Sequence, residues 1–479
     1  MKDLSRIRPR KSEPKGRPDY YITPTHDFKQ YTRDSAENFW NQDSAFDWGQ
    51  DVKENLRKNL EGLRPAGFSK VVSMVLPMVA ESVDQKIHLV RQGGLPANVD
   101  ALKDIEECLP GDKPAIQEAL RIQAPLQGFK AEVAALEDRV EILREELTDL
   151  KERQRLGYVK EGVLARPAAS ETERNAQEEE LKELEARVRA AEEKCRVARE
   201  SGRVKAGELK AKVKAEFKRI EGEVLRDLEE TRALLARGME GETGEMPALK
   251  SLILKRQLRG LKDIANHALV VEQSAIAPLT MGIIHYKRHR EIQEALTTFI
   301  NDEAKHSATF RRFLVEKLDA REFVSSNLIR GANRYMWLAR FLPGMGLFLA
   351  VIVEAIGAAY LEFFGEEEYM PDKLFRKICH TISVQDERRH MDLCVGMYNE
   401  LFRKGRRWER YRNGMALKVM MKSVYGDKTD DHHLIQAFRA FGVGSDVLYK
   451  HIFDRLSQQL ARVSMYVTPE TLMGYIGRN

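Results

Sequence analysis

One pattern of residues occurs twice in this chain and constrains its fold more than any other feature. Each copy has a glutamate in an apolar run and, 31 or 33 residues later, the motif Glu-x-x-His. Residues three apart lie on one face of an α-helix, so each motif directs a carboxylate and an imidazole the same way. The spacing matches a long helix, a turn and part of the next helix, which returns the partners to one height in a bundle. The six residues are Glu272, Glu303, His306, Glu354, Glu387 and His390.

Charge gives this pattern its physical meaning. Four carboxylates in an apolar interior would each be strongly destabilising if they remained unpaired. Two divalent cations and two neutral imidazoles offset that cost, and a set of oxygen and nitrogen donors suits iron or manganese. No cysteine occupies a ligand position, which argues against a structural zinc site. The six residues are therefore predicted to be the ligands of a buried two-metal centre.

The neighbours of the two upstream glutamates argue against the simplest alternative, a set of surface salt bridges. Glu272 follows Leu269-Val270-Val271, and Glu354 follows Val351-Ile352-Val353. Both runs are too apolar for a solvated helix face. A single Glu-x-x-His motif arises easily by chance, but two motifs with matched upstream glutamates favour a shared buried site.

An aspartate stands immediately before each Glu-x-x-His motif, at Asp302 and Asp386. Metal-bound histidines usually donate their second ring N–H to a carboxylate, which fixes the tautomer. We hypothesise a crossed arrangement in which Asp302 contacts His390 and Asp386 contacts His306. The alternative is that both aspartates lie on the helix surface.

The chain has 479 residues, of which 43% are apolar, and we expect it to be all-α. Apolar residues alternate steps of four and three from Phe129 to Leu150 and again from Leu181 to Ala198, which is a heptad seam. With a turn at Gly157 to Ser170, these runs predict an antiparallel coiled-coil arm, which would serve self-association, a homodimer included, or partner docking. The predicted parts are a basic flexible tail (1–34), an N-terminal helical region (35–127), the arm (128–238), the metal-binding bundle (247–405) and C-terminal covering helices (406–479).

Charge and cysteine usage limit the expected partners and compartment. Residues 1–18 hold seven basic and two acidic side chains, which alone equals the net charge of +5, so we expect no nucleic-acid partner. Four cysteines without a Cys-x-x-Cys pair and no apolar signal segment favour a cytoplasmic protein. The run from Phe341 to Phe364 has the length of a membrane span, but Pro343, Gly344 and the central Glu354 lead us to expect no membrane span. Trp40 is expected to be a packing residue, with electron transfer as the alternative.

The set Glu…Asp-Glu-x-x-His…Glu…Asp-Glu-x-x-His resembles that of the ferritin-like di-iron carboxylate oxygenase superfamily. Its members include monooxygenase hydroxylases, arylamine N-oxygenases and acyl-carrier desaturases. The resemblance covers residues 250–405, roughly a third of the chain, and is specific for the metal site rather than for the reaction. It implies a ferritin-like four-helix bundle, here with a coiled-coil insertion and additional covering helices. It also implies two iron ions or a manganese–iron pair, O2 as co-substrate, and an external electron donor such as a reductase or ferredoxin.

Several positions depart from the patterns of individual families. Radical-generating ribonucleotide reductase subunits have a tyrosine where this chain has Phe310. Hydroxylases and desaturases commonly have a threonine one turn after the third glutamate, where Gly357 and Ala358 leave space for a substrate. Arylamine N-oxygenases have an additional histidine ligand where this chain has Ser383. Nearby, His380 is either a core or supporting histidine or a seventh ligand.

Polar residues also follow one stripe of the predicted fourth helix, where they line a channel or form hydrogen bonds in the core: His380, Ser383, Glu387, His390, Cys394 and Tyr398. We expect an oxygenase that oxidises a small organic or carrier-bound substrate by hydroxylation, N-oxygenation or desaturation. One alternative is a ferritin-like or rubrerythrin-like protein that oxidises iron or handles peroxide. Another is a coiled-coil scaffold with a regulatory metal site. A cavity beside the metals would favour the oxygenase.

Overall fold

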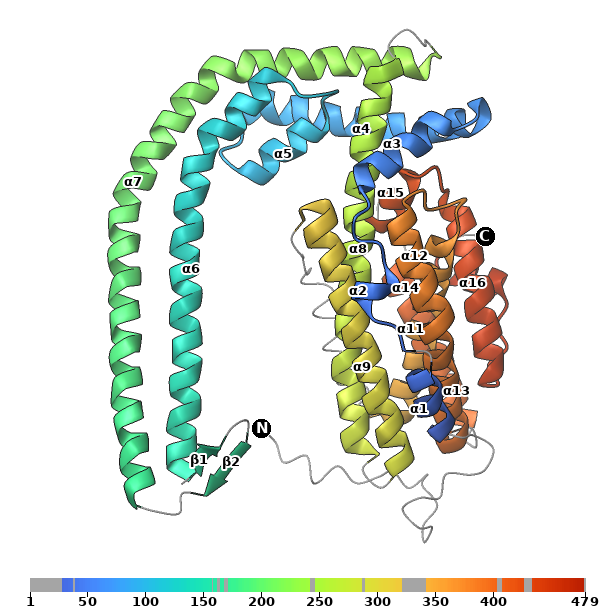
Figure 1. Cartoon of the computed structure of the whole chain (residues 1–479). Helices are drawn as coiled ribbons and strands as arrows, with labels where there is room; N and C mark the ends of the chain where they lie inside the picture. The colour runs from blue at the N-terminus through green and yellow to red at the C-terminus, as the bar shows by residue number, and fades with distance from the viewer. Residues whose placement is uncertain are drawn as a thin grey trace. The chain divides into compact units, whose positions relative to one another are not determined.

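The computed structural model describes residues 28–37, 39–156, 158–161, 164–167, 171–241, 246–286, 289–320, 342–402, 407–425 and 433–477. Within these ranges the secondary structure is helical apart from one two-stranded hairpin, which confirms the predicted all-α class (Figure 1). The chain divides into two compact units. One unit comprises the chain up to Met78 together with Ile253 onward, and the other comprises Val79–Leu252.

The predicted metal ligands lie on four helical segments of the first unit, which run alongside one another in Figure 1. The first three segments are α8 (Met246–His285), α9 (Arg290–Arg312) and α11 (Pro343–Gly365). The fourth consists of α12 (Lys373–Ile382), the π-helical turn η3 (Ser383–Glu387) and α13 (Arg388–Phe402). The sequence predicted the fourth segment as one uninterrupted α-helix, so η3 is a local difference within it.

Local sequence explains where these helices begin and which face they bury. The side chain of Asp372 accepts a hydrogen bond from the Phe375 backbone N–H at 2.7 Å and so caps α12. The buried residues of α9 recur at helical spacing from Ile292 to Phe310, which buries one face of the helix. A second π-helical turn, η2 (Phe313–Lys317), follows α9. Residues 321–341, which fall within the predicted bundle of residues 247–405, lie outside the described residues.

The C-terminal helices pack on this bundle. They are α14 (Arg407–Tyr425), α15 (His433–Arg439), α16 (Ser445–Arg462) and α17 (Pro469–Tyr475). α16 lies against α11, and their buried side chains join one hydrophobic core. Gly260 permits a close approach of α8 to α15, because a Cβ at this position would lie 2.8 Å from the Ala437 carbonyl oxygen.

The N-terminal part of the chain differs from the predicted tail of residues 1–34. α1 (Phe28–Glu37) begins before that boundary and packs against α9. Tyr31 is buried, which offsets the entropy cost of ordering the segment. Three helices follow: α2 (Gln42–Ala45), α3 (Val52–Gly62) and α4 (Pro65–Gly93). Residues 1–27 lie outside the described residues.

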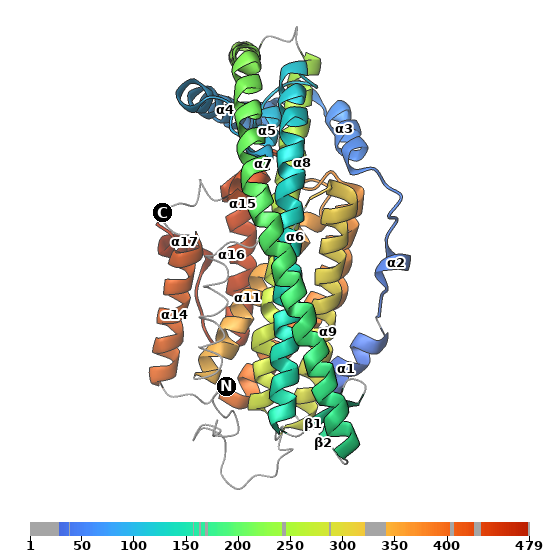
Figure 2. The same ribbon diagram turned by 90° about the vertical axis from the view of Figure 1, so that its left-hand side faces the viewer.

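The second unit contains the predicted arm. After α5 (Val99–Glu107), the long helices α6 (Pro114–Leu156) and α7 (Glu171–Met239) lie side by side (Figures 1 and 2). Leu143 and Leu150 pack with Leu184 and Val188, as the heptad pattern requires. The predicted turn contains a short hairpin in which β1 (Tyr158–Glu161) pairs antiparallel with β2 (Leu164–Pro167).

Ion pairs between α6 and α7 define the register of the arm. Arg199, Glu192 and Glu185 of α7 pair with Glu137, Arg144 and Lys151 of α6, respectively. Each step is seven residues forward on α6 and seven residues back on α7, so the helices are antiparallel. The heptad seam of α6 therefore pairs with that of α7 of the same chain.

The expectation of no membrane span is wrong. Three helical stretches are long and apolar enough to cross a membrane by length and composition: Pro65–Gly93, Met246–His285 and Gly344–Gly365. The last has a mean hydropathy of 2.0 over 18 residues. Pro343 does not interrupt it, because proline is tolerated at the first position of a helix. The single carboxylate of Glu354 lowers the mean hydropathy of so apolar a run only slightly.

Candidate metal centre

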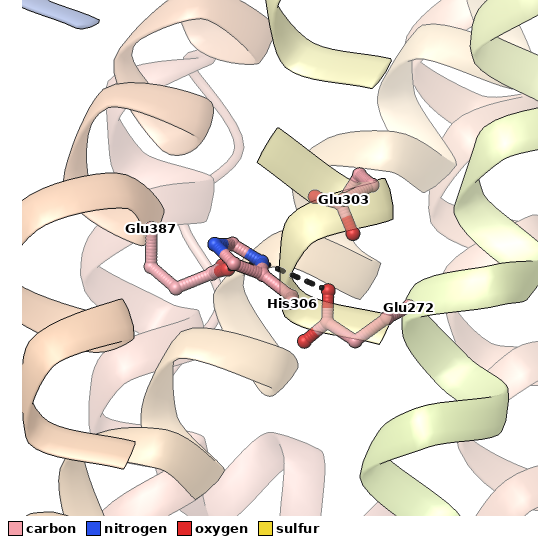
Figure 3. Close-up of side chains that lie close together, drawn as sticks. All are labelled: Glu272, Glu303, His306 and Glu387. Atoms are coloured by element: carbon pink, nitrogen blue, oxygen red, sulfur yellow. Dashed lines mark hydrogen bonds and ion pairs between the residues drawn. The ribbon is translucent and has the colours of Figure 1, made fainter. Parts of the chain in front are cut away.

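The six predicted ligands come together as two overlapping groups of side chains. Within each group, one ligand atom from every residue lies within 4.8 Å of the others. Figure 3 shows the first group, drawn from α8, α9 and η3: Glu272, Glu303, His306 and Glu387. The second group contains Glu303, Glu354, Glu387 and His390. Since Glu303 and Glu387 belong to both groups, the geometry fits two adjacent ions that share two carboxylates.

Both imidazoles direct Nδ1 into the carboxylate cluster. His306 Nδ1 lies 3.2 Å from Glu272 Oε2 and 3.8 Å from Glu387 Oε1. His390 Nδ1 lies 3.1 Å from Glu303 Oε1 and 3.5 Å from Glu387 Oε1. Both histidine side chains are fully buried. A buried imidazole whose Nδ1 faces several carboxylates fits a metal ligand.

The carboxylates of the cluster are buried too closely to be ionised together without cations. Burial and the neighbouring Glu272 carboxylate raise the pKa of Glu303 well above its usual range. Burial and the neighbouring Glu387 carboxylate likewise raise the pKa of Glu354. Two divalent cations would offset this repulsion and allow all four carboxylates to be charged. The donor set therefore fits metal ions.

Among the protein groups alone, the imidazoles supply positive charge to the cluster. Burial lowers the pKa of His306, but the Glu272 carboxylate and the hydrogen bond to Asp386 outweigh burial and raise it to about 10. Burial likewise opposes protonation of His390, but Glu387 and Asp302 raise its pKa to about 9. Metal ions would have to displace both protons, because only a neutral imidazole binds a metal.

An aspartate lies on the outer nitrogen of each histidine, in the crossed order. His306 Nε2 is 2.9 Å from Asp386 Oδ2, and His390 Nε2 is 3.5 Å from Asp302 Oδ2. Burial opposes ionisation of both aspartates, but the hydrogen bonds from the histidines outweigh it and lower both pKa values. A carboxylate on Nε2 favours the tautomer that leaves the Nδ1 lone pair free for a metal.

Two basic residues that the sequence reasoning missed complete this outer layer. Lys305 Nζ lies 3.3 Å from Asp302 Oδ1 and 3.0 Å from Asp386 Oδ2. Arg389 forms ion pairs with the same two aspartates. The two positive and two negative side chains thus form a balanced network behind the histidines. A signal was present in the sequence, because the third residue of each Glu-x-x-His motif is basic.

The N-terminal segment also contributes polar groups to this layer. Trp40 Nε1 donates a hydrogen bond of 2.7 Å to Asp386 Oδ2, and its ring stacks on that of His306 at a centroid distance of 6.2 Å. On the other half, Ser35 Oγ and Tyr31 OH lie 3.3 Å and 3.5 Å from Asp302 Oδ2. No local pattern linked Tyr31 and Ser35 to the metal motifs.

The other predicted site residues have three kinds of surroundings. Phe310 is fully buried and packs near Phe375. Cys394 is buried, which raises the pKa of its thiol, with Glu354 adding to the effect. The Tyr398 hydroxyl accepts a hydrogen bond of 2.9 Å from Asn413 Nδ2, so this end of the stripe has core hydrogen bonding. A Cβ added to Gly357 would meet nothing within 4 Å, so there is open space beside it.

His380 is not the core histidine that the stripe indicated, because its side chain is exposed. His380 lines a cavity together with Ser383, Glu387 and Ala358, so this part of the predicted stripe faces the cavity.

This cavity has a volume of about 650 Å³ and lies among α11, α12, η3, α13 and α16. Glu387, which belongs to both ligand groups, is part of its wall. The volume is in the usual range for small-molecule sites. A small organic molecule bound there would lie next to the candidate metal centre.

Comparison of this chain with protein-family models, with curated proteins and with solved structures finds no match. Its function is therefore inferred from the geometry and chemistry of the side chains.

Proposed function

We propose that this chain is a non-haem di-iron oxidoreductase with a ferritin-like bundle, which uses O2 to oxidise a small organic or carrier-bound substrate. The observation that carries the proposal is the pair of ligand groups that share Glu303 and Glu387. A pair of iron ions, or of manganese and iron, would supply O2 binding and electron transfer. The electrons would come from an external donor.

The protein side chains divide the work of holding the two ions. Glu272 and His306 would hold one ion and Glu354 and His390 the other. The shared carboxylates would keep the ions adjacent, and their negative charge favours the oxidised state. The aspartates on the Nε2 atoms keep both imidazoles oriented with Nδ1 toward the centre. The apolar surroundings keep water away from the reaction.

The cavity supports oxidation of an organic substrate over iron storage. It is large enough for a small molecule, and its wall includes a candidate bridging carboxylate. Ala358, one turn after Glu354, contributes a small side chain to the same wall. A storage protein needs a path for ions rather than a partly apolar cavity of this size. Hydroxylation, N-oxygenation and desaturation all fit such a cavity.

The proposal is tested by loading the protein anaerobically with Fe(II) and then adding O2. We expect two irons per chain by metal analysis, coupled high-spin ferric sites by Mössbauer spectroscopy, and a transient optical band after mixing. The variant Glu354→Ala should lose the transient band, whereas Glu316→Ala, a change of an exposed glutamate outside the site, should keep it. Progressive accumulation of a mineral with many irons per chain would instead establish storage. A single iron per chain would rule out the two-metal centre.

A further inference from the structure

The walls of the cavity described above separate apolar from charged side chains. Small apolar side chains of α11, namely Ala355, Ala358 and Ala359, form one part. Across from them, Val384 and Met391 add apolar surface, and Val384 is 57% exposed although it belongs to the bundle. An exposed valine in the wall of a cavity leaves apolar area available to a ligand. The site therefore favours a substrate with an apolar body.

The charged part of the wall contains three arginines, of which two have carboxylate partners. Arg455 Nε lies 2.7 Å from Glu362 Oε2, and Arg462 Nη2 lies 2.6 Å from Asp392 Oδ1. Arg388 differs from them, because its side chain has no hydrogen bond or ion pair among the residues that the structure describes, whereas its backbone N–H donates to the Asp386 carbonyl oxygen. Its guanidinium is exposed at the cavity and has all of its donors available.

The remaining acidic groups of the wall do not neutralise Arg388. Glu362 already faces Arg455 and, at 3.6 Å, His451. Glu366 belongs to the far end of the cavity, since the preceding Gly365 packs on the backbone of His380, two helical turns before Arg388. The next residue toward the metal centre is Glu387, whose charge the ions would take up. In the part of the cavity near the metal centre, the unmatched charge is therefore the Arg388 guanidinium.

We propose that this cavity binds an organic anion, a carboxylate with an apolar body, as the substrate of the centre. Arg388 receives the carboxylate, and the alanine wall of α11 receives the apolar body beside Glu387. A planar guanidinium can hold a carboxylate through two parallel hydrogen bonds, which fixes orientation as well as charge. The assignment of this ligand as a substrate rests on the proposed function, whereas its binding does not.

Calorimetric titration with three probes of equal chain length tests the charge preference: octanoate, octan-1-ol and octylammonium. The iron-loaded and iron-free proteins are both titrated, under anaerobic conditions. We expect octanoate to bind at least about tenfold more tightly than octylammonium, as one charge-assisted hydrogen bond would give. Equal affinity for the three probes, preference for octylammonium, or absence of binding by all three would overturn the proposal.

Three variants assign the binding to individual residues. Arg388→Gln should weaken octanoate binding about tenfold and leave the affinity for octan-1-ol within about twofold of the wild type. Ala358→Leu fills space at the apolar wall and should weaken the binding of both octanoate and octan-1-ol. Arg290→Gln, an exposed arginine of α9 outside the cavity, is the matched control and should bind like the wild type. If Arg388→Gln weakens octanoate no more than Arg290→Gln does, Arg388 is not the anion site.

Iron content and melting temperature are measured on the same samples. They distinguish failure of this proposal from failure of the proposed function. Octanoate binding by a protein that takes up no iron would keep the anion site and refute the di-iron function. Two bound irons without octanoate binding would refute the anion site and keep the di-iron function. If Arg388→Gln no longer melts cooperatively, Arg388→Lys replaces it. Lysine keeps the charge but lacks the planar pair of donors, so its affinity for octanoate should be below that of the wild type but not lost.

Discussion

The two halves of the candidate metal centre have the same ligand types but different surroundings. The first half has Glu272 and His306, with Asp386 at 2.9 Å from the imidazole and Trp40 hydrogen-bonded behind it. The second half has Glu354 and His390, with Asp302 at the longer distance of 3.5 Å. It is also the half next to the cavity, because Ala355 and Ala358 follow Glu354 on α11.

This difference separates the contribution of the repeated motif, which is the metal ligands, from that of the surrounding residues, which is the support of those ligands and the space beside them. The motif supplies a glutamate and a histidine to each half, so the two halves should bind metal by the same chemistry. The tighter outer contacts of the first half favour a fixed imidazole. The small residues around the second half leave room for a substrate. We therefore expect the first half to hold its ion more firmly and the second half to be where oxidation occurs.

The largest expected effects come from removing ligands. Glu387→Ala should lose both ions, because this carboxylate belongs to both groups. His306→Ala and His390→Ala should each retain about one ion per chain, which metal analysis after gel filtration measures, with Glu316→Ala as the unchanged control. Loss of both ions from either histidine variant would show that the halves do not bind metal separately.

The outer aspartates should show the asymmetry directly. Asp386→Asn should weaken metal binding about 10- to 100-fold, as loss of a carboxylate behind a metal-bound histidine does. Asp302→Asn should have a smaller effect, because its contact to His390 is longer. Competition with a chromophoric chelator gives both affinities. A larger loss for Asp302→Asn would reverse the assignment of the firmer half.

The pH dependence of metal binding follows from the raised histidine pKa values. Since the pKa of His306 is about 10 and that of His390 about 9, both are protonated at neutral pH and must lose protons to bind metal. Affinity should therefore rise with pH, and calorimetry in buffers of different ionisation enthalpy should detect proton release. Metal affinity that is independent of pH between 6 and 8 would contradict this.

The iron-free protein should show the opposite trend in stability. A histidine whose pKa is raised on folding contributes its full stabilisation to the folded state below its unfolded pKa of about 6.5. This contribution is lost as the pH rises through the folded-state pKa. The melting temperature of the iron-free protein should therefore fall between neutral pH and about pH 10. The melting temperature of the iron-loaded protein should lack this fall with pH, because its imidazoles carry no dissociable proton on Nδ1.

The smallest expected effect is on the N-terminal contacts. Trp40→Phe removes the hydrogen bond to Asp386 and should cost about 1.5 kcal/mol of unfolding free energy, the low end for a bond to a charged group. Ser35→Ala removes a longer contact to Asp302 and should cost less. Denaturant unfolding measures both. An equal cost would mean that the two halves depend on the N-terminal segment to the same degree.

The sequence alone determined the features that depend on local periodicity. Heptad spacing identified α6 and α7, and the three-residue spacing of Glu303–His306 and Glu387–His390 placed each pair on one helical face. Apolar neighbours indicated burial of Glu272 and Glu354, because a helix segment that packs in a core is mostly apolar.

Only the tertiary structure decided the features that depend on contacts between distant residues. Trp40 and Asp386 are 346 positions apart, and no periodicity relates them. His380 is exposed at the cavity rather than buried in the core, and an apolar run with one glutamate met the length and hydropathy criteria for a membrane span, which the sequence analysis did not expect. Helical spacing fixes which side chains share a face, whereas packing between elements fixes which faces meet. The candidate ligands and the crossed aspartates behind them were therefore readable in the sequence, but the contacts from Trp40, Ser35 and Tyr31 and the lining of the cavity were not.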